Sequence, residues 1–160
     1  MKKTISVLVE KDSGGLARII SLLTRRRFLI DSITIGRCER EYFERLMIVV
    51  IDENDGNDSA LQLTKQLRKL LNVIEVQDIS DCESVRRELL LIKIQANFTE
   101  RTEILNLAKI LGFRIIDIGE LTISLEATSD PQEITLLQKE LKSYKILELF
   151  RTGEIALTRE

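Results

Sequence analysis

The stretch TISVLVEKDSGGLARIISLLTRRRFLIDSIT, residues 4–34, decides the fold. Its first seven residues alternate in polarity, which predicts a half-buried strand with Ile5, Val7 and Val9 on its inner side. After a five-residue loop, apolar side chains recur at the spacing of one helix face, at Leu16, Ile19, Ile20 and Leu23. Three arginines, residues 25–27, mark the helix end, where the helix dipole favours cations. A second alternating run, residues 29–38, then predicts another strand.

The rest of the first half completes one domain. Residues 43–51 are too continuously apolar to be exposed on both faces, which predicts a third strand. Residues 52–58 are rich in Asp, Asn and Gly and form a loop, whose spacing lacks the frame of a calcium-binding loop. A helical face follows between Ala60 and Leu71, and a fourth strand is predicted at residues 73–79.

The second half repeats this order, with strands predicted at residues 89–96, 113–118, 121–127 and 144–150. A helix face ends before Gly112, a typical C-cap residue. A second helix is predicted from Asp130 as cap, Pro131 as first residue and Glu133 as the partner in a capping box. Residues 155–157 are expected to pair as a further strand. We therefore predict an α+β fold of two tandem ferredoxin-like βαββαβ domains, residues 1–80 and 81–160, with the C-terminal tail in the second.

Histidine is absent from the 160 residues, and this narrows the function more than any other feature. Its absence removes the usual general base at neutral pH, the Ser-His and Cys-His nucleophile pairs and most zinc sites. We therefore predict no catalytic and no metal-binding residue. The 24 basic and 26 acidic residues nearly cancel, so no global field favours nucleic acid or a membrane surface.

Two features of the sequence bear on its compartment. Cys38 and Cys82 form no CxxC pair, which favours a reducing compartment. No run of 18 apolar residues occurs, and the first residues are too interrupted for a signal peptide. We expect a soluble protein of a bacterial cytoplasm, or of the plastid stroma if an organelle genome encodes it.

The loop of residues 11–15, KDSGG, is the candidate binding site. It connects a strand to a helix N-terminus, where backbone N–H groups and the positive end of the helix dipole gather. Glycine lets a ligand approach the backbone closely. The loop therefore suits a small anion such as the carboxylate of an amino acid, and the alternative is a tight turn that needs two glycines.

Several segments of the chain carry a specific family resemblance. In the first half they are SVLVE at residues 6–10, Ser13 and Gly14, LARI at 16–19, Leu22, Arg26 and IDSIT at 30–34. In the second half they are REL at 87–89, IKI at 92–94, IID at 115–117, ILEL at 146–149 and the specific tail RTGEIAL at 151–157. Together these segments resemble the small, regulatory subunit of acetolactate synthase. The resemblance covers almost the whole chain and implies that residues 1–80 are an ACT domain.

The resemblance implies a non-catalytic subunit in branched-chain amino-acid biosynthesis. The family's large subunit condenses two pyruvates, or pyruvate and 2-oxobutyrate, with thiamine diphosphate, magnesium and a flavin, and none of these cofactors is expected on this chain. The small subunit stimulates the large one and confers sensitivity to valine. Its ACT domains pair edge to edge as a homodimer, with a valine-like effector beside the strand-to-helix loop. This implies effector contacts from Lys11, Asp12, Ser13, Gly14, Gly15, Leu16, Leu29 and Ile30.

The sequence departs from the family pattern around two expected effector contacts. The family typically has Asn where this chain has Lys11, and Gly, then Tyr or Phe, then Asn where it has Arg27, Phe28 and Leu29. Those asparagines are expected to hydrogen-bond the effector, whereas Leu29 has no polar group and Lys11 can only donate. A lost polar partner at a buried site commonly costs about 1–3 kcal/mol. We expect activation to survive and valine feedback to be weakened.

Two other functions stay open. A stand-alone amino-acid-sensing ACT protein would bind an effector but act on a different enzyme. A nucleic-acid binder of the same topology needs exposed aromatics on central strands and a basic sheet, which Tyr42, Phe43 and a pI of about 5.5 do not provide. The expected partners are therefore a large catalytic subunit, a second copy and an amino acid, with no nucleic acid and no membrane.

Overall fold

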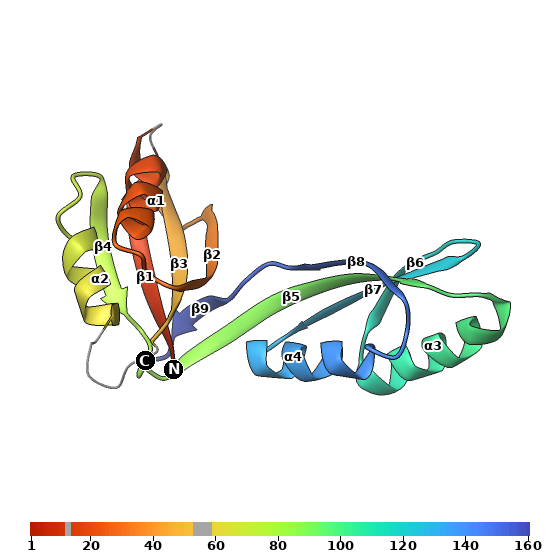
Figure 1. Ribbon diagram of the computed structural model, residues 1–160. Helices are drawn as coiled ribbons and strands as arrows, with labels where there is room; N and C mark the ends of the chain where they lie inside the picture. The colour runs from red at the N-terminus through yellow and green to blue at the C-terminus, as the bar shows by residue number, and fades with distance from the viewer. Residues whose placement is uncertain (12–13, 53–58) are drawn as a thin grey trace. The chain divides into compact units, whose positions relative to one another are not determined.

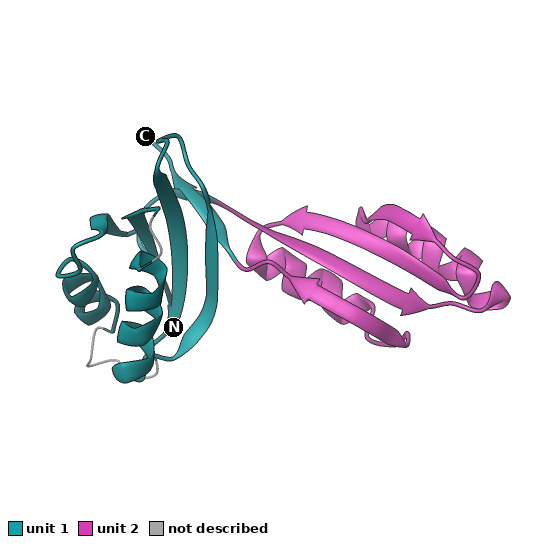
Figure 2. Cartoon of the chain, turned by 90° about the horizontal axis from the view of Figure 1, so that it is seen from above, with its two compact units in different colours: residues 1–85, 154–160 teal, residues 86–153 magenta. Residues whose placement is uncertain are grey.

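The computed structural model describes residues 1–11, 14–52 and 59–160 (Figure 1). They divide into two compact units, residues 1–85 with 154–160 and residues 86–153 (Figure 2). Sequence analysis placed the boundary at residue 80 and the tail with the second domain, whereas the structure groups residues 154–160 with the first unit. The chain passes from unit 1 to unit 2 within β5 (Ser84–Gln95), which begins earlier than the strand predicted at residues 89–96.

Unit 1 has the predicted β-α-β-β-α-β order. Its elements are β1 (Lys2–Glu10), α1 (Gly15–Arg25), β2 (Ile30–Arg37), β3 (Phe43–Ile51), α2 (Ser59–Leu67) and β4 (Val73–Asp78). The strands form an antiparallel sheet in the order β2-β3-β1-β4, so β2 and β4 are its edges. This is the ferredoxin-like arrangement predicted from the alternating and helical periods of the sequence.

The core of unit 1 lies between the sheet and its two helices (Figure 1). The alternating residues of β1 that sequence analysis assigned to the inside, Ile5, Val7 and Val9, are fully buried there. The prediction that β1 is only half-buried is wrong, because residues 4, 6 and 8 on its other face are buried as well. Ile19 and Leu23 of α1 pack against them, whereas Leu16 and Ile20 of the same predicted face are exposed. The opposite face of the sheet carries the C-terminal tail, because Ala156 of β9 (Ile155–Thr158) is buried with Met47 and Ile79.

Unit 2 repeats the topology with β5, α3 (Phe98–Leu111), β6 (Arg114–Ile118), β7 (Thr122–Ser129), α4 (Pro131–Glu140) and β8 (Ile146–Arg151). Its strand order is β6-β7-β5-β8, and β9 also pairs with β5. Gly112 ends α3 with a φ of 80°, as predicted for a C-cap. Asp130 caps α4 by accepting from the Gln132 N–H at 2.9 Å. The predicted capping box with Glu133 is wrong, because that carboxylate accepts from the Ser129 hydroxyl instead.

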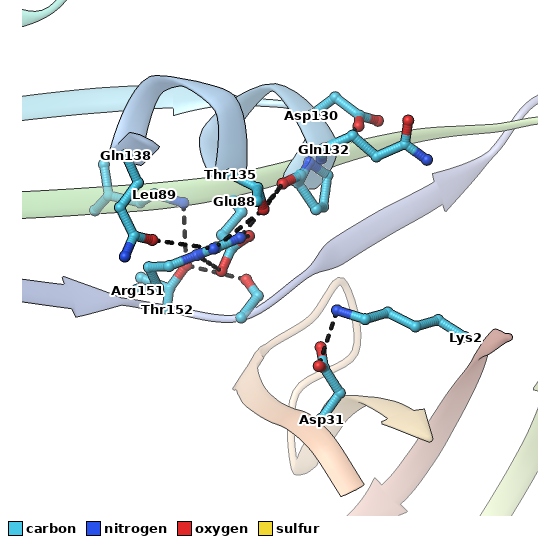
Figure 3. A network of polar contacts seen from close by, with 12 residues as sticks. Lys2, Asp31, Glu88, Leu89, Asp130, Gln132, Thr135, Gln138, Arg151 and Thr152 are labelled. Carbon is cyan, nitrogen blue, oxygen red and sulfur yellow. Dashed lines mark hydrogen bonds and ion pairs between the residues drawn. The ribbon is translucent and has the colours of Figure 1, made fainter. Parts of the chain in front are cut away.

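A buried ion pair ties the end of β8 to β5 and α4 within unit 2 (Figure 3). The Arg151 guanidinium donates to both carboxylate oxygens of Glu88, at 3.0 Å and 2.6 Å. It also donates to the hydroxyl of Thr135 and the side-chain oxygen of Gln138, both on α4. Since the Glu88 side chain is only 7% exposed, its negative charge is stabilised by this arginine rather than by water.

Within the described residues, no helix is long and apolar enough to cross a membrane.

Candidate functional site

The predicted binding loop connects β1 to α1. The backbone N–H of Lys11 donates to the carbonyl of Tyr42 at 2.8 Å, which fixes the start of the loop beside the β2–β3 turn. Asp12 and Ser13 lie outside the described residues. The N-cap of α1 is Gly14, which has no side chain that could cap the helix. The first turn of α1 contains no acidic residue, and the positive end of a helix dipole attracts anions.

Gly15 is the second glycine of the loop and the first residue of α1. A Cβ there would lie 3.1 Å from the Cγ2 of Val9 and 3.4 Å from the carbonyl oxygen of Glu10. The start of the helix therefore lies so close to the end of β1 that a side chain at position 15 would crowd Val9. Gly15 is thus needed for packing, which agrees with the tight-turn interpretation of this position.

Asn72 forms hydrogen bonds with residues on both sides of the loop, and sequence analysis missed it. It is 8% exposed, its carbonyl accepts from the Glu10 N–H at 2.9 Å, and its side-chain oxygen accepts from Arg18 at 3.0 Å. Asn72 therefore joins the end of β1, the start of β4 and the second turn of α1. The signal was present in the sequence as one polar residue between the apolar Leu70–Leu71 pair and Val73.

Leu29 and Ile30, the other predicted contacts, lie at the opposite end of the same sheet. Ile30 pairs with Val50, and the Ile51 N–H donates to the Leu29 carbonyl at 2.8 Å. The neighbouring Asp31 forms an ion pair of 2.8 Å with Lys2, the first residue of β1 (Figure 3). Since the loop follows the last residue of that nine-residue strand, about 25 Å of strand separates the two halves of the predicted site. One chain does not bring them together.

The turn that leads to Leu29 has the backbone geometry of a glycine C-cap. The N–H of Phe28 donates to the carbonyl of Leu23 at 3.4 Å and that of Arg27 to Thr24 at 3.3 Å, which is a Schellman motif. Arg27 occupies its left-handed position with a φ of 55°. This is the position where the family pattern has glycine, and the structure gives the physical reason for that preference.

Strand β2 is an open edge of the unit 1 sheet, since within the described residues it pairs only with β3. Large apolar side chains are exposed on this strand, the turn before it and α1, at Leu16, Ile20, Leu29, Ile30 and Ile35. An unpaired edge beside exposed apolar side chains is a typical surface for association with another chain.

Within the described residues, no three His, Cys, Asp or Glu side chains come together in a group that could hold a metal ion.

The ferredoxin-like unit with a glycine loop between its first strand and helix is an ACT domain. A family model described as an AHAS small subunit-like ACT domain matches residues 5–75, and one described as the small subunit of acetolactate synthase matches residues 87–160. The chain belongs to the acetolactate synthase small-subunit family.

Individual relatives agree with this membership. The probable acetolactate synthase small subunit of Archaeoglobus fulgidus is 41% identical over 99% of this chain and 98% of its own length. The acetolactate synthase small subunit of Mycolicibacterium smegmatis is 39% identical over 98% of this chain and 90% of its own. The crystal structure of the small subunit from Thermotoga maritima superposes with a TM-score of 0.89 at 31% identity, over 100% of this chain and 98% of that one. These relatives cover both units, so the family assignment does not rest on the ACT domain alone.

Proposed function

We propose that this chain stimulates the thiamine-diphosphate-dependent catalytic subunit of acetolactate synthase and binds a valine-like amino acid between two copies of itself. The full-length similarity to acetolactate synthase small subunits supports the first part. The separation of the loop at Gly14 from Leu29 and Ile30 supports the second. The thiamine diphosphate, magnesium and flavin would all belong to the catalytic subunit.

Pairing of two β2 edges reunites the separated halves of the site. If β2 pairs antiparallel with β2 of a second copy about a two-fold axis, the start of one strand lies opposite the end of the other. The end of β2, at Arg37, pairs with Glu44 at the same end of the sheet as Glu10 and the loop. Leu29 and Ile30 of one copy then lie beside the loop of the other, and two equivalent sites form.

Such a site suits the carboxylate and side chain of valine better than its ammonium group. The α1 N-terminus at Gly14 attracts the carboxylate, and Lys11 adds a positive charge near it. Leu16, Leu29 and Ile30 surround the aliphatic side chain. The ammonium group lacks the asparagine acceptors of the family pattern, and a missing partner of this kind weakens affinity by roughly 1–3 kcal/mol. Valine feedback is therefore weak, while activation is kept.

Acetolactate formation by the cognate catalytic subunit tests the assignment. We expect this chain to increase the rate several-fold and valine to inhibit only at high concentration. Leu29→Asn should lower the inhibitory valine concentration roughly tenfold, since one hydrogen bond is worth about 1.4 kcal/mol here. Leu61→Asn, which changes an exposed leucine on α2, is the matched control. Failure to stimulate at any subunit ratio would favour a stand-alone amino-acid sensor.

Mixed dimers test whether each site uses two chains. Gly14→Leu blocks the loop without backbone strain, because Gly14 has an ordinary φ of −109°, and Leu29→Arg blocks the other half. Each variant alone should bind no valine by calorimetry. After the two are mixed and exchanged, half the dimers contain both chains and each has one intact site, so about a quarter of all sites return. No recovery, with exchange verified by mass spectrometry, would place the whole site in one chain.

A further inference from the structure

A cavity lies on the face of the unit 1 sheet that the helices do not cover. Its volume is about 360 Å³, at the small end of the range for pockets that bind small molecules. Ser6, Met47 and Gln77 lie side by side at its base, because Ser6 pairs with Met47 on β3 and with Gln77 on β4. Residues 156–158 of β9 form another wall. Among the described residues, the cavity shares no lining residue with Lys11, Gly14 and Gly15 of the loop or with Leu29 and Ile30.

One end of this cavity is apolar. Met47, Ile79 and Ala156 are buried together there, with exposed fractions of 5%, 1% and 5%. The tail that supplies Ala156 is held in place independently of any ligand. Glu154 accepts from the Thr4 hydroxyl at 2.9 Å, and the Arg159 N–H donates to the Glu83 carbonyl at 2.8 Å. The apolar end is therefore already formed.

The other end carries one positive and one negative side chain. Arg45 donates to the Ser6 hydroxyl at 3.3 Å and to the Glu39 carboxylate at 3.0 Å. A guanidinium has five N–H donors, so these two bonds leave others for a ligand. A hydrogen bond from its own backbone, followed by the charge of Arg45, lowers the pKa of Glu39, so this carboxylate is ionised at neutral pH. The polar end thus presents both charges and no net charge.

The two ends are a short distance apart along the strands. On β1, residues 4 and 8 lie two positions on either side of Ser6 and on the same face of the strand. Arg45 pairs with Leu8, and the Ile79 N–H donates to the Thr4 carbonyl. Two positions along a strand span about 6.6 Å. A carboxylate and an ammonium held at the polar end therefore leave room for an aliphatic side chain of a few carbons before Ile79.

We propose that this cavity is a second small-molecule site, which takes an apolar α-amino acid as its zwitterion. Arg45 and the Ser6 hydroxyl bind the carboxylate, Glu39 binds the ammonium, and Met47, Ile79 and Ala156 surround the side chain. Because one wall is the C-terminal strand, the bound amino acid also contacts that strand. The site lies within one chain, so it does not depend on pairing of the β2 edges.

Methyl-detected NMR of the full chain tests this proposal. The probes are the Met47 ε-methyl and the Ala156 methyl, and the ligands are L-leucine, 4-methylpentanoate, which lacks the ammonium, and leucinamide, which lacks the carboxylate. We expect saturable shifts of both methyls with leucine and at least tenfold weaker binding of each analogue. Arg45→Gln should weaken leucine binding at least tenfold, and Arg37→Gln, an exposed arginine on β2, is the matched control.

Three results would overturn the proposal. The first is no saturable shift at either methyl up to about 10 mM leucine, a concentration that detects even millimolar affinity. The second is equal binding of leucine and its two analogues, which would indicate apolar adsorption without charge recognition. The third is loss of the shifts in Gly14→Leu, which would show that they are transmitted from the loop. Persistence of the shifts in Gly14→Leu separates this site from the proposed interface site even if the latter fails.

Discussion

Replacement of Arg27 by glycine is expected to stabilise the protein. Arg27 has a φ of 55°, and a residue with a Cβ commonly costs about 1–2 kcal/mol in that region. Glycine avoids this cost but loses about 0.5–1 kcal/mol more chain entropy on folding. The Arg27 side chain makes no hydrogen bond or ion pair with a described residue, so little else is lost. The free energy of unfolding should rise by about 0.5–1 kcal/mol.

Urea unfolding of the full chain measures this gain, and thermal unfolding should show a rise of about 1–4 °C in Tm for a chain of this length. Arg26→Gly is the matched control, because the neighbouring arginine has an ordinary φ of −91°. Glycine there brings only the entropy cost and should destabilise by about 0.5–1 kcal/mol. Both variants remove one charge from the same cluster, so opposite signs isolate the backbone effect. A loss of stability in Arg27→Gly would refute the reasoning.

Other changes test the packing and the ion pairs. Gly15→Ala should destabilise by about 1 kcal/mol in urea, because its methyl would lie 3.1 Å from a Val9 methyl; a gain would show that Val9 moves aside freely. Arg151→Met should lower the free energy of unfolding, measured by thermal unfolding, by roughly 3 kcal/mol, because it leaves the buried Glu88 carboxylate without its ion-pair partner. The double variant Arg151→Met with Glu88→Leu should recover much of that loss. Burial raises the pKa of Tyr144, so its contribution to stability is complete below the unfolded pKa of about 10 and is lost as pH rises through the folded value. The urea midpoint should therefore fall more steeply above pH 10 in the wild type than in Tyr144→Phe, and equal slopes would contradict this.

Local pattern predicted the element order but not the contacts made by the tail. The alternation of Ile5, Val7 and Val9 identified a buried strand face correctly. The helical spacing around Ile19 identified the buried face of α1 only in part, because Leu16 and Ile20 are exposed. The early start of β5 at Ser84 was missed, because that end of the strand pairs with β9, some 70 residues further along the chain. Long-range pairing of this kind leaves no periodic signal in a short window.

The candidate loop was predictable from the sequence, but its separation from Leu29 and Ile30 was not. Two glycines between a strand and a helix signal a helix N-terminus from sequence alone. The position of Leu29 relative to that loop depends on the direction in which α1 returns along the sheet, and the pairing of Ile30 with Val50 places it at the far end. Asn72 was missed for a related reason, since its buried role exists only when the end of β1 and the start of β4 lie together.

Two departures from the family pattern, Arg27 and Leu29, fall within one turn, and the structure separates their effects. Arg27 acts on the backbone, because it holds the left-handed position of the motif that ends α1. Phe28, which lies between them, packs against the core of unit 1 and anchors the turn. Leu29 is 48% exposed at the open edge, so its side chain affects the affinity for a ligand or chain that binds at this edge rather than the stability of the fold. Arg27→Gly should therefore raise stability and leave the valine response unchanged, while Leu29→Asn should sharpen the valine response with stability changed by less than about 0.5 kcal/mol. If Arg27→Gly alone produced strong inhibition, strain in the turn rather than the missing amide would account for the weak feedback that we propose.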